Sequence, residues 1–132
     1  MEIVVLPTRA ALAREAAARF VAITQDAIRA RGWFAVALAG GSTPREMYEL
    51  LAAPEFAAQV DWARVQVFWG DERTVPPDHP DSNFKTANDA LLSRVPIQLQ
   101  NVHRIRAELP AEDAAREYEE TLSTFFKNDI GR

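Results

Sequence analysis

The residues best suited to chemistry form a short loop, Gly40-Gly41-Ser42-Thr43, between an apolar run and the start of a predicted helix. Two glycines let the backbone turn tightly and approach a ligand closely. The N–H groups at a helix start, together with the positive end of the helix dipole, attract anions, and the Ser42 and Thr43 hydroxyls could add donors. These residues fit a phosphate-binding loop and a well-capped turn equally. The loop lacks the lysine of a P-loop and the spacing of a dinucleotide fingerprint.

A second polar cluster, Gly70-Asp71-Glu72-Arg73, follows another apolar run. Carboxylates there can act as acid or base, and a guanidinium can hold a phosphate with two hydrogen bonds. An isolated cluster of this kind is more often a salt-bridged turn. Opposite an anion-binding loop, however, it becomes a candidate functional site.

The two histidines give little support for a catalytic or metal site. His79 lies in a proline-rich loop and His103 in a predicted strand, and a lone histidine in either setting is more often structural. They are far apart in the sequence and lack a regular pattern of carboxylates, so no metal site is predicted. The absence of cysteine excludes thiolate ligands and disulfides.

Hydrophobic patterns predict strands that alternate with helices and so position these clusters. Strands are predicted at 3–6, 33–39, 65–69 and 101–105. Helices are predicted at about 8–31, from 43 to the proline at 54, from 81 or 82 to the proline at 96, and from 110 onward. In the first helix, the apolar side chains at helical spacing are Leu12, Ala16, Phe20, Ile23 and Ala27.

Helix boundaries are marked by specific residues. Gly32 is predicted to end the first helix. Thr43 is predicted as the N-cap of the second helix, with Pro44 at its first position and Glu46 at its third, which would form a capping box.

Alternating strands and helices predict an α/β fold, a three-layer αβα arrangement with a mostly parallel Rossmann-like sheet, in a single domain over residues 1–132. In such sheets, the loops that follow the strands gather at one edge, and ligands bind there. We therefore expect loops 40–43 and 70–73 to face the same crevice.

The composition of the chain limits the kinds of partner that it is expected to bind. The net charge of -4 and the lack of a basic cluster argue against a nucleic-acid-binding surface. No apolar run approaches the ~20 residues that cross a bilayer, and the N-terminus lacks the basic start of a signal peptide. We expect a cytoplasmic protein without membrane contact.

Several motifs in order resemble those of 6-phosphogluconolactonases. The stretch Ala39-Gly40-Gly41-Ser42-Thr43-Pro44, followed by Met47-Tyr48-Glu49-Leu50-Leu51, is similar to their first motif. Val67-Phe68-Trp69-Gly70-Asp71-Glu72-Arg73, followed by Asp78-His79-Pro80-Asp81-Ser82-Asn83, resembles their second. Glucosamine-6-phosphate deaminases share the fold and a Gly-Ser-Thr-Pro loop, but they have a tyrosine after the Asp-Glu pair. Arg73 therefore favours the lactonase.

The resemblance implies hydrolysis of 6-phosphoglucono-δ-lactone to 6-phosphogluconate in the oxidative pentose phosphate pathway, with a small sugar phosphate as partner and with no metal or organic cofactor. It implies catalytic roles for Asp71 and Arg73, which would face the lactone and the phosphate. The implied substrate- and phosphate-binding residues are Gly40, Gly41, Ser42, Thr43, Arg73, Ser82 and Asn83.

The resemblance covers only the N-terminal half of a family protein. The presumed general base of the family is a histidine in a later Gly-x-Asp-Gly-His stretch, which this sequence lacks. We therefore expect a truncated α/β fold that is inactive alone and that tends to dimerise through exposed surface. The alternatives are a non-catalytic sugar-phosphate-binding or partner module, an enzyme that uses His79 or His103, and a deaminase-like isomerase.

Overall fold

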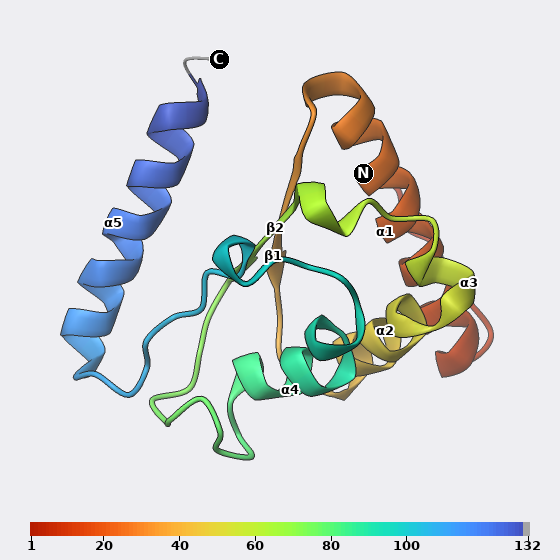
Figure 1. Ribbon diagram of the computed structural model, residues 1–132. Coiled ribbons are helices and arrows are strands. Elements are labelled where there is room, and N and C mark those ends of the chain that lie inside the picture. The colour runs from red at the N-terminus through yellow and green to blue at the C-terminus, as the bar shows by residue number, and fades with distance from the viewer. Residues whose placement is uncertain (131–132) are drawn as a thin grey trace.

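The computed structural model describes residues 1–130, with side chains to Lys127. Its helices and strands, shown in Figure 1, are α1 (Arg9–Arg31), β1 (Phe34–Leu38), α2 (Ser42–Ala52), α3 (Pro54–Ala57), β2 (Val65–Trp69), α4 (Asn83–Ala90) and α5 (Ala111–Ile130). Short 3₁₀ turns occupy Trp62–Arg64, Leu92–Arg94 and Leu99–Asn101. Within residues 1–130, no helix combines the length and the apolar character that a membrane span requires.

The sheet consists of β1 and β2, which pair in parallel from Phe34 opposite Val65 to Leu38 opposite Trp69. The predicted strand at 101–105 is wrong as a strand, because it contributes one parallel bridge between Val67 and Val102. The His103 N–H adds a hydrogen bond to the Val67 carbonyl at 2.8 Å. A 3₁₀ turn before this point and backbone turns after it prevent a longer ladder.

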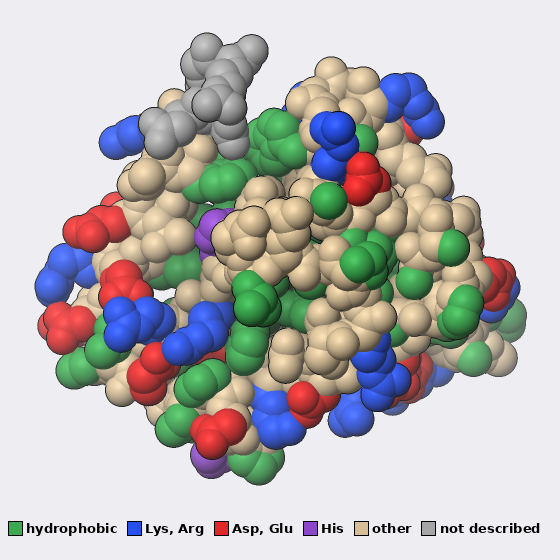
Figure 2. Space-filling view, in the orientation of Figure 1, with side chains coloured by type: hydrophobic (Ala, Val, Ile, Leu, Met, Phe, Trp, Pro, Cys, Tyr) green, Lys and Arg blue, Asp and Glu red, His purple; other side chains and the backbone are tan. Residues whose placement is uncertain are grey.

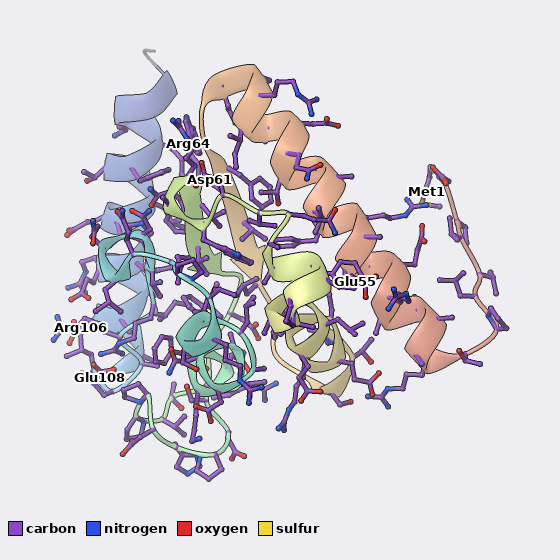
Figure 3. All side chains as sticks on the ribbon, turned by 45° about the vertical axis from the view of Figure 1, so that its right-hand side comes forward. Met1, Glu55, Asp61, Arg64, Arg106 and Glu108 are labelled. Atoms are coloured by element: carbon purple, nitrogen blue, oxygen red, sulfur yellow. The ribbon has the colours of Figure 1, made fainter. Side chains whose placement is uncertain are left out.

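The predicted strand at 3–6 is also wrong. This segment is extended but joins no sheet among the described residues. Ile3 and Val5 are 74% and 87% exposed, and Figure 3 shows that the chain from Met1 runs outside α1. A β-branched sequence favours extended backbone, but a strand also needs an edge to pair with. The expected four-stranded sheet is therefore a two-stranded sheet with one bridge in the described part of the chain.

One face of the sheet packs against α1, α2 and α4. Phe34 meets Phe20 of α1 edge-on at 5.6 Å between ring centroids, and Trp69 lies 5.5 Å from Phe84 of α4. The α1 prediction is correct in its length and in its end at Gly32, which is left-handed, and the structure adds Thr8 as the N-cap. Its buried stripe differs from the prediction and comprises Ala13, Ala17, Phe20, Val21, Thr24 and Ala27. Leu12 and Ile23 are instead exposed.

The opposite face of the sheet is approached by α5, which stands across the strands from α1 and α2 in Figure 1. Phe68 stacks on the His103 ring at 4.5 Å and meets Phe125 of α5 at 5.1 Å. Figure 2 shows hydrophobic side chains in the space between α5 and the rest of the molecule. Helices therefore lie on both faces of this α/β sheet.

Two buried tyrosines fix the carboxyl ends of the strands. Tyr48 of α2 accepts the Ala39 N–H at 3.0 Å and donates to the Ala39 carbonyl at 2.6 Å, just beyond β1. Tyr118 of α5 accepts the Trp69 N–H at 2.8 Å and donates to the His103 carbonyl at 2.9 Å. Burial raises the pKa of both hydroxyls. Each hydroxyl thus holds a strand end where the candidate site begins.

We predict that Tyr118→Phe destabilises the fold by about 1–3 kcal/mol, because it leaves the buried Trp69 N–H without its acceptor. Urea unfolding followed by circular dichroism would measure the change. Thr121→Val is the matched control, since the Thr121 hydroxyl only bonds back to the Glu117 carbonyl within α5. Equal unfolding midpoints for both variants would contradict the tyrosine's role.

We predict that acid weakens the packing of α5 through His103. Burial lowers the pKa of His103 from its usual 6.5, so the unfolded chain binds this proton more readily than the folded chain. The contribution of neutral His103 is present above about pH 6.5 and decreases as the pH falls below the unfolded-state pKa. Unfolding at pH 7.5 and 5.5 should show a smaller loss of stability for His103→Gln than for the parent chain. An identical loss would refute this assignment.

Candidate functional site

The loops after β1 and β2 meet at a cleft of about 690 Å³. Its lining residues are Gly41, Ser42, Arg45, Glu72, Arg73, Thr74, Val75, Pro80, Asp81, Asn83 and Thr86. The Gly70 N–H donates to the Leu38 carbonyl at 3.1 Å, which extends the parallel pairing to the start of the second loop. The prediction that loops 40–43 and 70–73 face one crevice is confirmed.

The glycine loop ends differently from the prediction. Helix α2 begins at Ser42 with Gly41 as its N-cap, so the Thr43 cap is wrong. The capping box is also absent, because Glu46 pairs with Arg9 at 2.7 Å. Gly41 has φ +107°, a left-handed value that favours glycine. Because no side chain caps α2, the N–H groups of Ser42 and Thr43 stay available to an anion, whereas Pro44 has no N–H and the Arg45 N–H donates to the Gly41 carbonyl at 3.2 Å.

Gly40 allows the loop to approach α4 closely. A Cβ atom built on Gly40 would lie 1.9 Å from Oδ1 of Asn83 and 2.5 Å from its Cγ. Asn83 is 6% exposed and donates from Nδ2 to the Asp71 carbonyl at 3.3 Å. Asn83 therefore lies between the two loops, and only glycine at position 40 leaves room for it.

The carboxylate of Glu72 joins the second loop to α4. Its Oε1 atom accepts N–H groups from Arg73 at 2.8 Å and Asn83 at 2.7 Å. Its Oε2 atom accepts the Phe84 N–H at 2.9 Å and the Ser82 hydroxyl at 3.3 Å. The sequence suggested an acid or base here, whereas the structure shows the carboxylate at the start of a helix.

Two guanidinium groups line the cleft, together with the carboxylates of Glu72 and Asp81. Arg73 is exposed and lines the cleft, and Arg45 lines it from the first turn of α2. Arg45 pairs with Glu49 at 3.2 Å, and both side chains are exposed, so this pair contributes little stability. Arg45 is not among the site residues predicted from the sequence. Its position three residues after Ser42, on the same helix end, was the available signal.

The predicted site residues take different places around the cleft. Gly41, Ser42, Arg73 and Asn83 line it. Thr43 lines a separate apolar hollow of about 310 Å³ beside β1. The remaining predicted residues, Gly40, Asp71 and Ser82, are not among the lining residues.

Ser82 and Asp71 differ in exposure. Ser82 is 1% exposed and caps α4 by accepting the Lys85 N–H at 3.1 Å, which selects it over Asp81, the other predicted start of this helix. Asp71 is exposed, and its Oδ1 atom lies 3.4 Å from Nδ2 of Asn83. Of the two neighbouring carboxylates, Asp71 and Glu72, Asp71 is thus the one that stays accessible.

Neither histidine lines the cleft. Nδ1 of His79 accepts the Asp81 N–H at 3.0 Å, which closes a turn in the proline-rich loop. His103 lies on the α5 side of the sheet, where its Nε2 is 2.9 Å from Oε1 of Gln66. Within the described residues, no group of three His, Cys, Asp or Glu side chains is arranged to hold a metal ion.

Comparisons of the sequence and the structure with known proteins point to the same family. The family described as glucosamine-6-phosphate isomerases/6-phosphogluconolactonase matches residues 7–132. A protein of Nostoc sp. named 6-phosphogluconolactonase is 43% identical over 129 residues, which cover 96% of this chain and 52% of that protein. The crystal structure of 6-phosphogluconolactonase from Thermotoga maritima superposes with a TM-score of 0.77 at 32% identity, over 86% of this chain and 50% of that one.

A structure of a monomeric glucosamine-6-phosphate deaminase superposes with a TM-score of 0.80 over 95% of this chain and 51% of that one. At 20% identity, this likeness shows the α/β fold alone. The chain spans about half the length of the relatives that it matches.

We predict that Gly40→Ala destabilises the fold by about 1–3 kcal/mol, because the new methyl group would displace Asn83 from the cleft. Thermal unfolding would measure the loss. Gly70→Ala is the matched control in the other loop, since its Cβ would meet only the Leu38 carbonyl, at 4.0 Å. We expect the control to stay within about 0.5 kcal/mol of the parent chain. A tolerated alanine at position 40 would show that the loop has more room than the structure gives it.

Proposed function

Because this chain belongs to the glucosamine-6-phosphate isomerase/6-phosphogluconolactonase family, we propose that its cleft binds a sugar phosphate and serves the hydrolysis of 6-phosphoglucono-δ-lactone to 6-phosphogluconate. The observation that carries the proposal is the convergence of the α2 start, Arg45 and Arg73 on one cleft. A helix start attracts anions, and guanidinium groups bind phosphate oxygens with charge-assisted hydrogen bonds.

The proposed roles follow from these positions. The phosphate binds Arg73 and the N–H groups beyond Gly41, and Asn83 shapes the wall opposite the loop. Because the phosphate is remote from the lactone carbonyl, its binding energy mainly orients the ring. Asp71, the accessible carboxylate, faces the lactone in this assignment.

Lactone hydrolysis also needs an activated water and a stabilised oxyanion. The histidine stretch that the family resemblance assigns to the base is not among these 132 residues. We therefore propose that these residues bind sugar phosphate with little or no turnover of their own.

We make three further proposals, on the domain and its sheet, on assembly, and on the cellular compartment. Residues 1–132 are proposed to form one domain. Its sheet would become a mostly parallel, three-layer αβα arrangement when further strands pair with β1, whose second edge is unpaired within the described residues. Dimerisation through that edge and a cytoplasmic setting are the corresponding proposals for assembly and compartment.

We predict that Arg73→Ala weakens the binding of 6-phosphogluconate by about 10–100-fold, because it removes charge-assisted hydrogen bonds to the phosphate. Isothermal titration calorimetry would measure the dissociation constants. Arg29→Ala is the matched control, since Arg29 pairs with Asp26 on the exposed surface of α1.

Two further titrations test whether the phosphate is recognised and whether the cleft prefers the ligand of a lactonase or of a deaminase. Gluconate, which lacks the phosphate, should bind far more weakly than 6-phosphogluconate. Glucosamine 6-phosphate should bind less tightly than 6-phosphogluconate, and the reverse order would favour a deaminase-like function. No binding of 6-phosphogluconate by the parent chain would overturn the proposal.

A further inference from the structure

We propose that Glu72 is a positioning residue of the cleft: its carboxylate fixes Arg73 and the start of α4 in place and takes no part in proton transfer. The inference deepens the proposed function and rests on it. It separates the two neighbouring carboxylates of the Gly70–Arg73 loop, which the sequence alone left equivalent.

The Glu72 carboxylate accepts hydrogen bonds from four donors. Three backbone N–H groups, those of Arg73, Asn83 and Phe84, approach its two oxygens at 2.7–2.9 Å. The Ser82 hydroxyl approaches Oε2 at 3.3 Å. Each oxygen therefore has two partners, which is the usual capacity of a carboxylate oxygen.

The partners of Glu72 also disfavour a proton on its carboxylate. Backbone N–H groups can only donate, so a proton on Oε1 would point at another donor. A proton on Oε2 could be accepted only by the Ser82 hydroxyl, which would have to reverse its present hydrogen bond. Glu72 could accept a proton from water or substrate only by breaking one of these hydrogen bonds. Asp71 is different, because the one hydrogen bond to its carboxylate among the described residues is that from Asn83 Nδ2 to Oδ1 at 3.4 Å.

The hydrogen bonds of Glu72 also close a loop of the chain. They join positions 72 and 73 to positions 82–84, across a segment that contains Pro76, Pro77 and Pro80. Arg73 sits at the entrance of this segment, and its N–H is held directly. Glu72 also lies in the wall between the cleft and a hollow of about 470 Å³ beneath α5. Because this wall is held in place, the backbone position from which the Arg73 side chain extends is held in place too.

Because Glu72 is negatively charged, a substitution that removes the charge can distinguish an electrostatic role from a positioning role. Removing a negative charge beside an anion site should, by electrostatics alone, tighten binding. Glu72→Gln keeps the size of the side chain but replaces one of its two oxygens with an NH₂ group, which would face a backbone N–H group, so the attachment of the loop to α4 is weakened. Weaker binding after this change therefore cannot come from the lost charge.

The experiment compares Glu72→Gln with two controls on α4. Ala87→Gly lowers the stability of the same helix at a buried position away from the cleft. Asp89→Asn removes one negative charge from the exposed side of that helix. The probe is 6-phosphogluconate, titrated by calorimetry, and hydrogen exchange of the Arg73 amide is followed by NMR spectroscopy without ligand.

We expect Glu72→Gln to weaken binding at least tenfold and to speed exchange of the Arg73 amide by at least tenfold. Both controls should stay within twofold in affinity and leave that amide protected. If the parent chain binds and Glu72→Gln matches Ala87→Gly in both measurements, Glu72 is only a helix cap and the inference is wrong. If the parent chain does not bind at all, the proposed function fails, and the inference fails with it.

Discussion

The interaction on which the cleft depends is the acceptance of backbone N–H groups at the start of α4 by the carboxylate of Glu72. A helix start leaves several N–H groups without partners inside the helix, and Ser82 satisfies only one of them. Glu72 satisfies two more, from Asn83 and Phe84, and so ties the loop after β2 to α4. Asn83, fixed in this way, then requires glycine at position 40. The two loops of the cleft are thus coupled through one helix end.

The strand ends are held by a different device that serves the same edge of the sheet. Tyr48 reaches the backbone just beyond β1 from α2, and Tyr118 reaches the end of β2 from α5 on the other face. Beyond these points the parallel ladder has ended, and buried backbone groups need other partners. Side chains from opposite faces of the sheet therefore stabilise the places where the two cleft loops begin. This gives loop residues the fixed positions that ligand binding requires.

The sequence predicted the features that depend on local pattern. The helix predicted from about Thr8 to Arg31, with Gly32 at its end, matches α1. The apolar runs predicted β1 and β2, and the alternation of strands and helices predicted the shared crevice. The features that depend on distant partners were not predictable. The segment at 3–6 has a strand composition but no strand beside it among the described residues, and Glu46 forms an ion pair with Arg9 where a capping box was expected. The role of Glu72 was equally hidden, because three of its four partners lie 10–12 positions along the chain.

An acidic chain with a net charge of -4 can still hold an anion if the charges near the site are arranged to favour it. The first turn of α2, Arg45 and Arg73 supply positive potential at the cleft. Glu72 would oppose this potential if its carboxylate were free. Its oxygens instead face two N–H dipoles at the start of α4 and the N–H of Arg73 in the loop, which offset the negative charge locally. The same contacts that position Arg73 therefore also reduce the repulsion that a phosphate would meet beside it.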